Sequence, residues 1–206
     1  LTFVGKAYAE VTYGVSASLT KISASGTETE GGETTSGDAD NTVIIPSLFA
    51  EYAYSDTVSI GLDYIPLKAD VSNKTKTRTD VESSVTGTVT TTSTTRNQRA
   101  QAELENHITV YANYMLGGDY YLKAGVAFVE LNTAESLPTG SKYGNEDIFG
   151  GVIGIGAQQG SSRFELVYTD YEDVSLTSSV ARTGVTTNNK IEADLDTVAL
   201  RYSYTF

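Results

Sequence analysis

Residues 3–19 alternate between two kinds of side chain with a period of two, and this pattern constrains the fold most. The odd positions are mostly apolar, whereas the even positions are mostly polar. An alternation sustained over some seventeen residues is about three times the usual strand length. The longest apolar run, 152–157, contains two glycines and is far shorter than the roughly 18 residues of a membrane helix. If the chain crosses a membrane, it must therefore cross as a closed β-barrel.

Length, charge and residue usage narrow the classes of protein further. At 206 residues the chain suits one barrel, so we expect a single domain over 1–206. It has no cysteine and one histidine, which argues against disulfides, metal sites and cofactors. A net charge of −12 repels phosphates, so we expect no nucleic-acid partner. Because the sequence starts within a strand pattern, we expect that a signal peptide has been removed.

Seven further segments repeat the two-faced pattern, and the connections between all eight alternate in length. The segments are 44–54, 58–64, 104–116, 122–128, 148–157, 163–169 and 198–206. Short turns at 55–57, 117–119 and 159–162 alternate with long connections at about 20–42, 69–100, 132–147 and 172–190. This pattern predicts an all-β, eight-stranded antiparallel up-and-down transmembrane barrel with three short periplasmic turns and four long extracellular loops.

Aromatic residues on the apolar faces gather near the two ends of the predicted strands. Such placement is typical of the interfacial girdles of membrane barrels, although tyrosine also favours strands in general. The girdle near the short turns would hold Phe3, Tyr54, Tyr114, Phe164, Tyr204 and Phe206, and the girdle near the loops Tyr13, Phe128 and Phe149.

The last five residues, 202–206, resemble the C-terminal signal of Gram-negative outer-membrane proteins, and residues 3–10 resemble the first strand of the same superfamily. The whole chain resembles the small eight-stranded outer-membrane barrels: the OmpA transmembrane domain, OmpX and the opacity-type surface proteins. This resemblance implies an integral outer-membrane location. It also implies outer-membrane lipid, lipopolysaccharide and the barrel-assembly machinery as partners. A ligand or surface at the extracellular loops is a further expectation, as is a monomeric state.

The polar faces of the predicted strands carry charges of both signs. An eight-stranded barrel has room inside only for its own side chains, and unpaired buried charges would cost several kcal/mol each. We therefore expect these residues to form a salt-bridged plug that closes the lumen; an ion or proton pathway is the alternative. The expected network comprises Lys6, Glu10, Glu51, Asp63, Glu105, His107, Lys123, Arg163, Glu165 and Arg201.

His107 is the only histidine, and Glu105 shares its predicted face. Residues 107–109 faintly resemble the His-x-Ser of outer-membrane lipid A deacylases, but Thr109 replaces the serine. A structural histidine paired with a carboxylate is the better interpretation, so we expect no catalytic residues.

These observations favour a non-catalytic barrel that serves envelope integrity or surface adhesion. An alternative is passage of small hydrophobic molecules, as in OmpW-type barrels, which would need an apolar lumen pocket; the charged inward set argues against one. The predicted first loop is acidic, and alternation around Val85 and Val89 suggests a protruding hairpin in the second.

Overall fold

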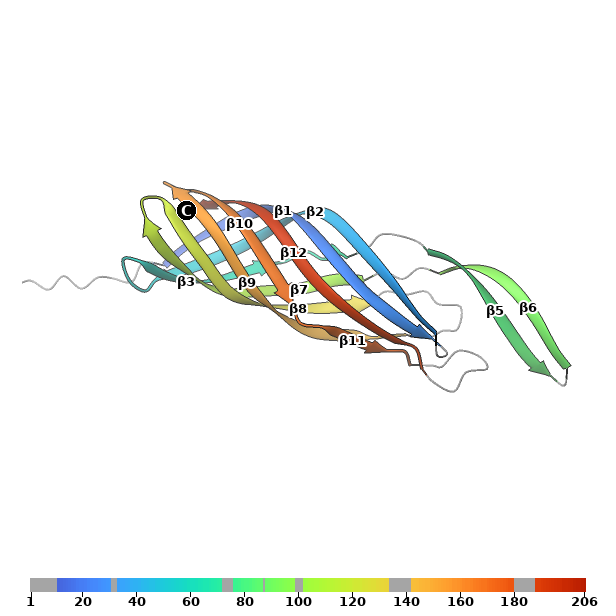
Figure 1. Cartoon of the computed structure of the whole chain (residues 1–206). Helices are drawn as coiled ribbons and strands as arrows, with labels where there is room; N and C mark the ends of the chain where they lie inside the picture. The colour runs from blue at the N-terminus through green and yellow to red at the C-terminus, as the bar shows by residue number, and fades with distance from the viewer. Residues whose placement is uncertain are drawn as a thin grey trace, which may run out of the picture.

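The computed structural model is a closed antiparallel β-barrel (Figure 1). It describes residues 11–30, 33–71, 76–86, 88–98, 102–133, 142–179 and 188–206. Pairing of the last barrel strand with the first closes the wall, so the predicted eight-stranded barrel is confirmed. In order around the wall, the strands are β1 (Val11–Glu30), β2 (Glu33–Ala53), β3 (Val58–Ile65), β7 (Ala102–Gly117), β8 (Tyr120–Thr133), β9 (Asn145–Gln159), β10 (Ser162–Tyr171) and β12 (Lys190–Thr205).

Four further strands lie outside this cycle. Strand β4 (Ala69–Asp70) pairs with β7, and β11 (Val174–Thr177) pairs with β12. Strands β5 (Lys76–Thr86) and β6 (Thr88–Gln98) form a separate two-stranded sheet, which extends beyond the end of the barrel in Figure 1. No helix in the described ranges is long and apolar enough to cross a membrane.

The first two strands are much longer than the sequence pattern predicts. Residues 20–42 were expected to form a long connection, yet β1 and β2 continue their ladder through this segment, from Thr20 paired with Val43 to Glu30 paired with Glu33. The prediction of a loop here is wrong, because alternation persists in the segment with its faces exchanged. Residues 1–10, including the predicted strand start at Phe3, lie outside the described residues.

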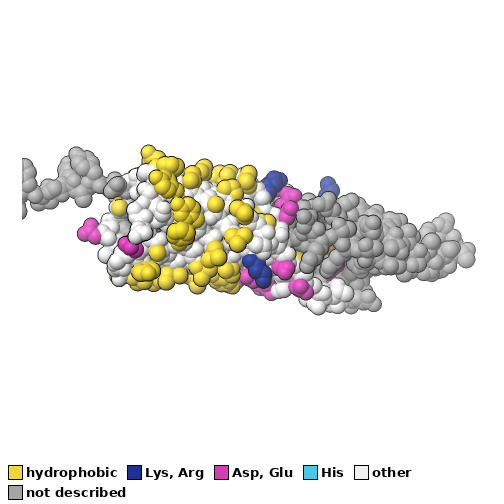
Figure 2. All heavy atoms as spheres, turned by 90° about the horizontal axis from the view of Figure 1, so that it is seen from above, with side chains coloured by type: hydrophobic (Ala, Val, Ile, Leu, Met, Phe, Trp, Pro, Cys, Tyr) yellow, Lys and Arg dark blue, Asp and Glu magenta, His cyan; other side chains and the backbone are white. Residues whose placement is uncertain are grey.

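Large apolar side chains are exposed on all eight strands of the wall and so form a band around the barrel. Figure 2 shows one face of this band as a yellow region with charged residues at both of its ends. Ile44 and Leu200 are 75% and 60% exposed. Such exposure would be unfavourable in water, since soluble proteins rarely leave large apolar patches uncovered. A band of this kind around a closed barrel is the surface that meets lipid.

Above this band, on the side of the β1–β2 hairpin, the polarity of the two faces is exchanged. On β12, Leu200 faces out and Arg201 faces in, but farther along the same strand Asp194 is exposed and Leu195 is buried. The exchange is expected where a barrel leaves hydrocarbon for water, because apolar side chains must then point inward. The barrel therefore has a membrane-spanning part and an upper part built like a soluble protein.

A hydrophobic core fills the upper part of the barrel. Ile22, Val129 and Ile148 are at most 1% exposed, and they pack with Leu104 and Leu195 from two other strands. This core stabilises the long hairpins above the membrane.

Candidate functional site

Six charged side chains fill the lower lumen and pair across it. Arg163 Nη1 lies 2.5 Å from Glu51 Oε1. Lys123 pairs with Glu165, and Arg201 pairs with Asp63 and lies 3.4 Å from Glu165 through its Nε atom. The three cations and three anions balance, so the network carries no surplus charge. Paired and hydrogen-bonded charges of this kind can be buried where single ones could not.

Neutral donors complete the coordination of the buried carboxylates. Tyr111 Oη and Asn113 Nδ2 donate to Glu51 over 2.8 and 2.9 Å. Ser47 Oγ donates to Asp63 over 3.0 Å and is itself 2.5 Å from Ser16 Oγ. These contacts tie strands from around the wall into one plug.

Aromatic rings and glycines shape the same region. The Phe49 ring lies beside two guanidinium groups, 5.4 Å from Arg163 and 5.7 Å from Arg201. A Cβ atom at Gly156 would overlap the ring of Tyr121, which is fully buried. The sequence pattern did not identify Phe49 or Tyr121 as part of this region.

The structure brings six of the ten expected lumen residues into the plug: Glu51, Asp63, Lys123, Arg163, Glu165 and Arg201. Lys6 and Glu10 lie outside the described residues. Glu105 and His107 lie elsewhere.

Glu105 is not a lumen residue, so its assignment to the network is wrong. The β7–β8 register shifts between Glu105 and Ile108, and Asn106 has a φ of 52°. Such a bulge exchanges the faces of the residues on one side of it relative to those on the other, here the residues before Asn106. Glu105 consequently pairs with Lys68 and accepts a 2.9 Å hydrogen bond from Asn132 on the outer face. Leu104, the residue before Glu105, is buried inside for the same reason.

His107 faces the lumen above the plug. Its Nε2 atom lies 2.9 Å from the hydroxyl of Tyr171, so the expected pairing of this histidine with a carboxylate is wrong. Its Nδ1 atom is buried and has no hydrogen-bond partner within the described part of the chain. Thr109 lies two positions along the same strand and is buried.

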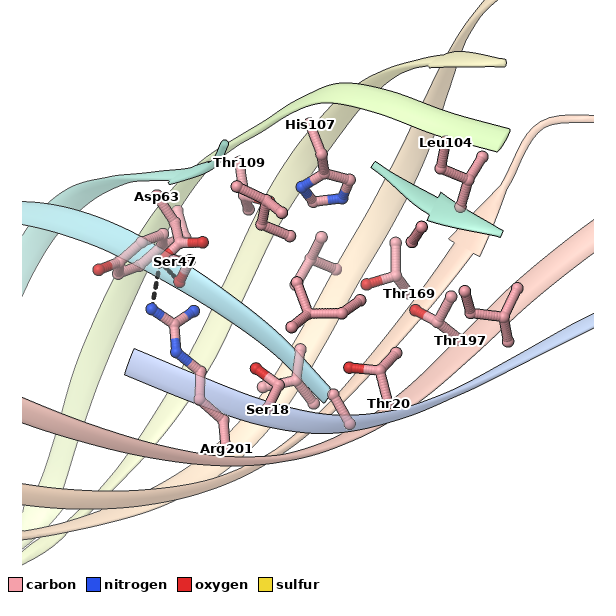
Figure 3. A pocket seen from close by; sticks show the side chains of 18 of the residues that line it. Ser18, Thr20, Ser47, Asp63, Leu104, His107, Thr109, Thr169, Thr197 and Arg201 are labelled. Carbon is pink, nitrogen blue, oxygen red and sulfur yellow. Dashed lines mark hydrogen bonds and ion pairs between the residues drawn. The ribbon is translucent and has the colours of Figure 1, made fainter. Parts of the chain in front are cut away.

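Between the plug and the upper core lies a cavity of about 90 Å³. In Figure 3, His107 points into this space from one side, and Thr20, Thr169 and Thr197 surround it on other strands, with Arg201 at one end. The apolar part of its lining includes Ile22, Ile45, Leu67, Leu104, Val152 and Val167. The lining of the cavity is thus polar next to the plug and apolar next to the upper core.

The barrel wall is incompletely paired beside this cavity. The β2–β3 ladder ends at Leu48 paired with Tyr64. Above the side-chain hydrogen bond from Ser47 to Asp63, the next one across this boundary among the described residues runs from Asn41 Nδ2 to the Asp70 carbonyl over 2.7 Å. At about 3.3 Å per residue, positions 42–47 leave roughly 20 Å of wall without ladder bonds. We call residues 42–47 and 65–69 the β2–β3 seam.

Two prolines and an exposed leucine mark the seam. Pro46 and Pro66 have no N–H to donate to a ladder, and proline in sheets is confined to edges and irregular positions. Leu67 lines the cavity and is 56% exposed, whereas Ile45 and Ala69 line it from within. Leu67 therefore lies between the cavity and the outer surface, close to the upper edge of the apolar band.

The outer aromatic residues lie at two levels, with one change from the expected set. Tyr13 was expected near the loops, but its ring centroid is 6.3 Å from that of Phe206, and the Phe206 N–H donates to its carbonyl over 3.0 Å. Tyr13 thus lies at the short-turn end with Tyr54, Tyr114, Phe164 and Tyr204. Phe128 and Phe149 lie farther up, with ring centroids 5.3 Å apart. Phe3 lies outside the described residues.

Metal-binding geometry is not found in the described part of the molecule. No group of three or more histidine, aspartate or glutamate side chains there is arranged to hold a metal ion. The lumen groups are instead committed to one another, as the ion pairs of the plug show.

The closed barrel with its outward apolar band defines an integral protein of the bacterial outer membrane, of the small eight-stranded class. Among solved structures, the chain is similar to OprG from Pseudomonas aeruginosa, with 12% identity, a TM-score of 0.54 and coverage of 95% of this chain and 96% of that one. It is also similar to AlkL in lipid bilayers, with 13% identity, a TM-score of 0.56 and coverage of 100% and 95%. At these identities the similarity shows a shared fold. No protein-family model and no curated protein matches the sequence.

Proposed function

We propose that this protein is a non-catalytic barrel that takes small apolar molecules into its upper lumen and exchanges them with the outer leaflet through the β2–β3 seam. The observation that carries this proposal is that Leu67, in the incompletely paired seam, both lines the cavity and is exposed on the outer surface. The apolar upper lining of the cavity is a surface that an apolar molecule can contact without losing hydrogen bonds.

The charge distribution supports a route through the barrel wall rather than along the barrel axis. The plug of buried ion pairs lies below the cavity and obstructs a path toward the short-turn end. The expectation that inward charges leave no apolar lumen pocket does not hold in the upper barrel, because the charged side chains are confined to the lower part. An apolar molecule in the cavity therefore has lipid beside it and charges beneath it.

A bulky residue at the seam tests the proposal. Ala69 is buried and lines the cavity, so Ala69→Phe would fill the space at this point. Ala124→Phe is the matched control, because Ala124 faces outward on β8. We expect Ala69→Phe to slow the uptake of radiolabelled toluene by cells carrying the protein severalfold, and Ala124→Phe to leave the rate unchanged. Equal uptake by the wild type, both variants and cells without the protein would refute the proposal.

A second candidate function is surface interaction through the β5–β6 hairpin. It extends beyond the barrel end in Figure 1, and its second strand is rich in threonine. Replacing residues 76–98 with a short Gly-Ser linker should abolish cell–cell aggregation caused by the protein, while toluene uptake persists. Unchanged aggregation would exclude the hairpin as the adhesive element.

A further inference from the structure

The cavity above the plug is lined by hydroxyl groups as well as by apolar side chains. Ser18 and Thr20 from β1, Thr109 from β7, Thr169 from β10 and Thr197 from β12 contribute to its wall. Figure 3 shows Thr20, Thr169 and Thr197 around one space. A hydroxyl group can donate one hydrogen bond and accept others. A wall of this kind fits a ligand that also carries a hydrogen-bonding group.

His107 adds an unused hydrogen-bonding atom to this wall. Its Nε2 atom is held 2.9 Å from the Tyr171 hydroxyl, whereas its buried Nδ1 atom has no partner among the described residues. Which ring nitrogen carries the proton depends on the tautomer. A ligand hydroxyl can serve either tautomer, because it donates to a bare Nδ1 and accepts from a protonated one.

The charges near the cavity argue against an ionised ligand. Arg201 and Asp63 line the cavity and pair with each other, and Lys123 pairs with Glu165. Because these groups already neutralise one another, a buried carboxylate or ammonium on the ligand would lack a counter-ion. Burial of such a charge is costly.

The size of the cavity limits the ligand to a few heavy atoms. Its volume of about 90 Å³ is smaller than the roughly 150 Å³ of an engineered apolar cavity that binds benzene. One aromatic ring is therefore the largest group that it could hold, and a short alkyl chain would fill it, with its body against Ile22, Leu104 and Val152.

We propose that the cavity selects small neutral molecules that carry one hydroxyl group, such as phenols or short-chain alcohols, over hydrocarbons and over carboxylates of the same size. This selectivity rests on the proposed function, because it names the class of molecule that occupies the same cavity.

Binding of three fluorinated probes tests the selectivity. The refolded barrel in detergent micelles is titrated with 4-fluorophenol, fluorobenzene and 4-fluorobenzoate, and binding is followed by ¹⁹F NMR against empty micelles. We expect 4-fluorophenol to bind about tenfold more tightly than fluorobenzene, the scale of one buried neutral hydrogen bond. We expect no binding of 4-fluorobenzoate in the cavity.

Two variants assign the preference to the cavity. His107→Phe should remove most of the preference for 4-fluorophenol while fluorobenzene still binds. Tyr114→Phe, which removes an exposed hydroxyl on the same strand, should change neither. Folding is checked by the heat-dependent migration of the barrel on gels, and Thr169→Val replaces His107→Phe if the latter does not fold.

The outcomes separate this inference from the proposed function. Equal affinities for phenol and hydrocarbon, binding of benzoate, or an unchanged preference in the folded cavity variant would overturn the selectivity. If seam-dependent toluene uptake persists in that case, the proposed function stands. If Ala69→Phe leaves toluene uptake unchanged but 4-fluorophenol is still preferred, the proposed route is overturned and the selectivity stands.

Discussion

Arg163→Met should destabilise the barrel strongly, because it removes the only cation that pairs with Glu51 in the described lumen. Glu51 is 4% exposed, and Arg163 Nη1 lies 2.5 Å from its carboxylate. The variant leaves Glu51 with two neutral donors, Tyr111 at 2.8 Å and Asn113 at 2.9 Å. Breaking a buried pair in this way costs about 3–5 kcal/mol, since an uncompensated charge stays behind.

The assay is reversible urea unfolding of the barrel in lipid vesicles, followed by tyrosine fluorescence. Lys190→Met is the matched control, because Lys190 and Glu192 form an exposed pair above the membrane band. We expect the control to change the free energy of unfolding by less than about 1 kcal/mol.

A double variant tests the reasoning directly. Glu51→Gln combined with Arg163→Met removes both charges, so its cost should be smaller than the sum of the two single costs by about 0.5–3 kcal/mol. A cost below about 1 kcal/mol for Arg163→Met alone, or strict additivity in the double variant, would refute the claim that the plug is a set of coupled buried pairs.

Three further outcomes are expected. Gly156→Val should lower the free energy of unfolding by about 1–3 kcal/mol through overlap with Tyr121, whereas Gly151→Val, where a Cβ meets no atom within 4 Å, should be nearly neutral in the same urea titration. Asp194 lies above the membrane band, where a hydrogen bond with Asp173 and repulsion by its charge raise the pKa of Asp194. The stability that this pair contributes is therefore present below the pKa of the unfolded state and is lost as the pH rises through the pKa of the folded state. Asp194→Asn should accordingly flatten the decrease in urea midpoint between pH 4 and pH 7, and an unchanged slope would exclude this pair as its cause. Planar-bilayer recordings of the wild type should give no steady single-channel conductance, and a reproducible one would contradict a closed plug.

The strand pattern in the membrane was predictable because each strand there follows one rule. Apolar residues face lipid and polar residues face the lumen, so a period of two identifies both faces from the sequence. The same rule located Glu51, Lys123 and Arg201 on the inner face, where the structure has them. Their individual partners could not be derived, because pairing across the lumen depends on strand tilt and stagger.

The bulge at Asn106 shows a limit of such reasoning. One left-handed residue exchanges the faces of the residues before it, which moves Glu105 outward and Leu104 inward. Asparagine tolerates a positive φ better than most residues, but an asparagine within a strand does not by itself indicate a bulge. The partner of His107 could not be predicted either, because Tyr171 comes from a strand three places away around the wall and a strand pattern gives no contacts across the lumen.

The upper barrel was taken for a loop because its polarity is opposite to that of the membrane-spanning part. In residues 20–26, Ile22 and Ala24 face inward while Ser23 and Ser25 face outward, so a search for outward apolar residues finds none. The period of two continues, and only its phase changes by one residue. A phase change without loss of period is therefore a sequence signal that a barrel strand leaves the membrane and continues in water. It also places the cavity, because the level at which the faces exchange is the level at which the polar plug gives way to the apolar core.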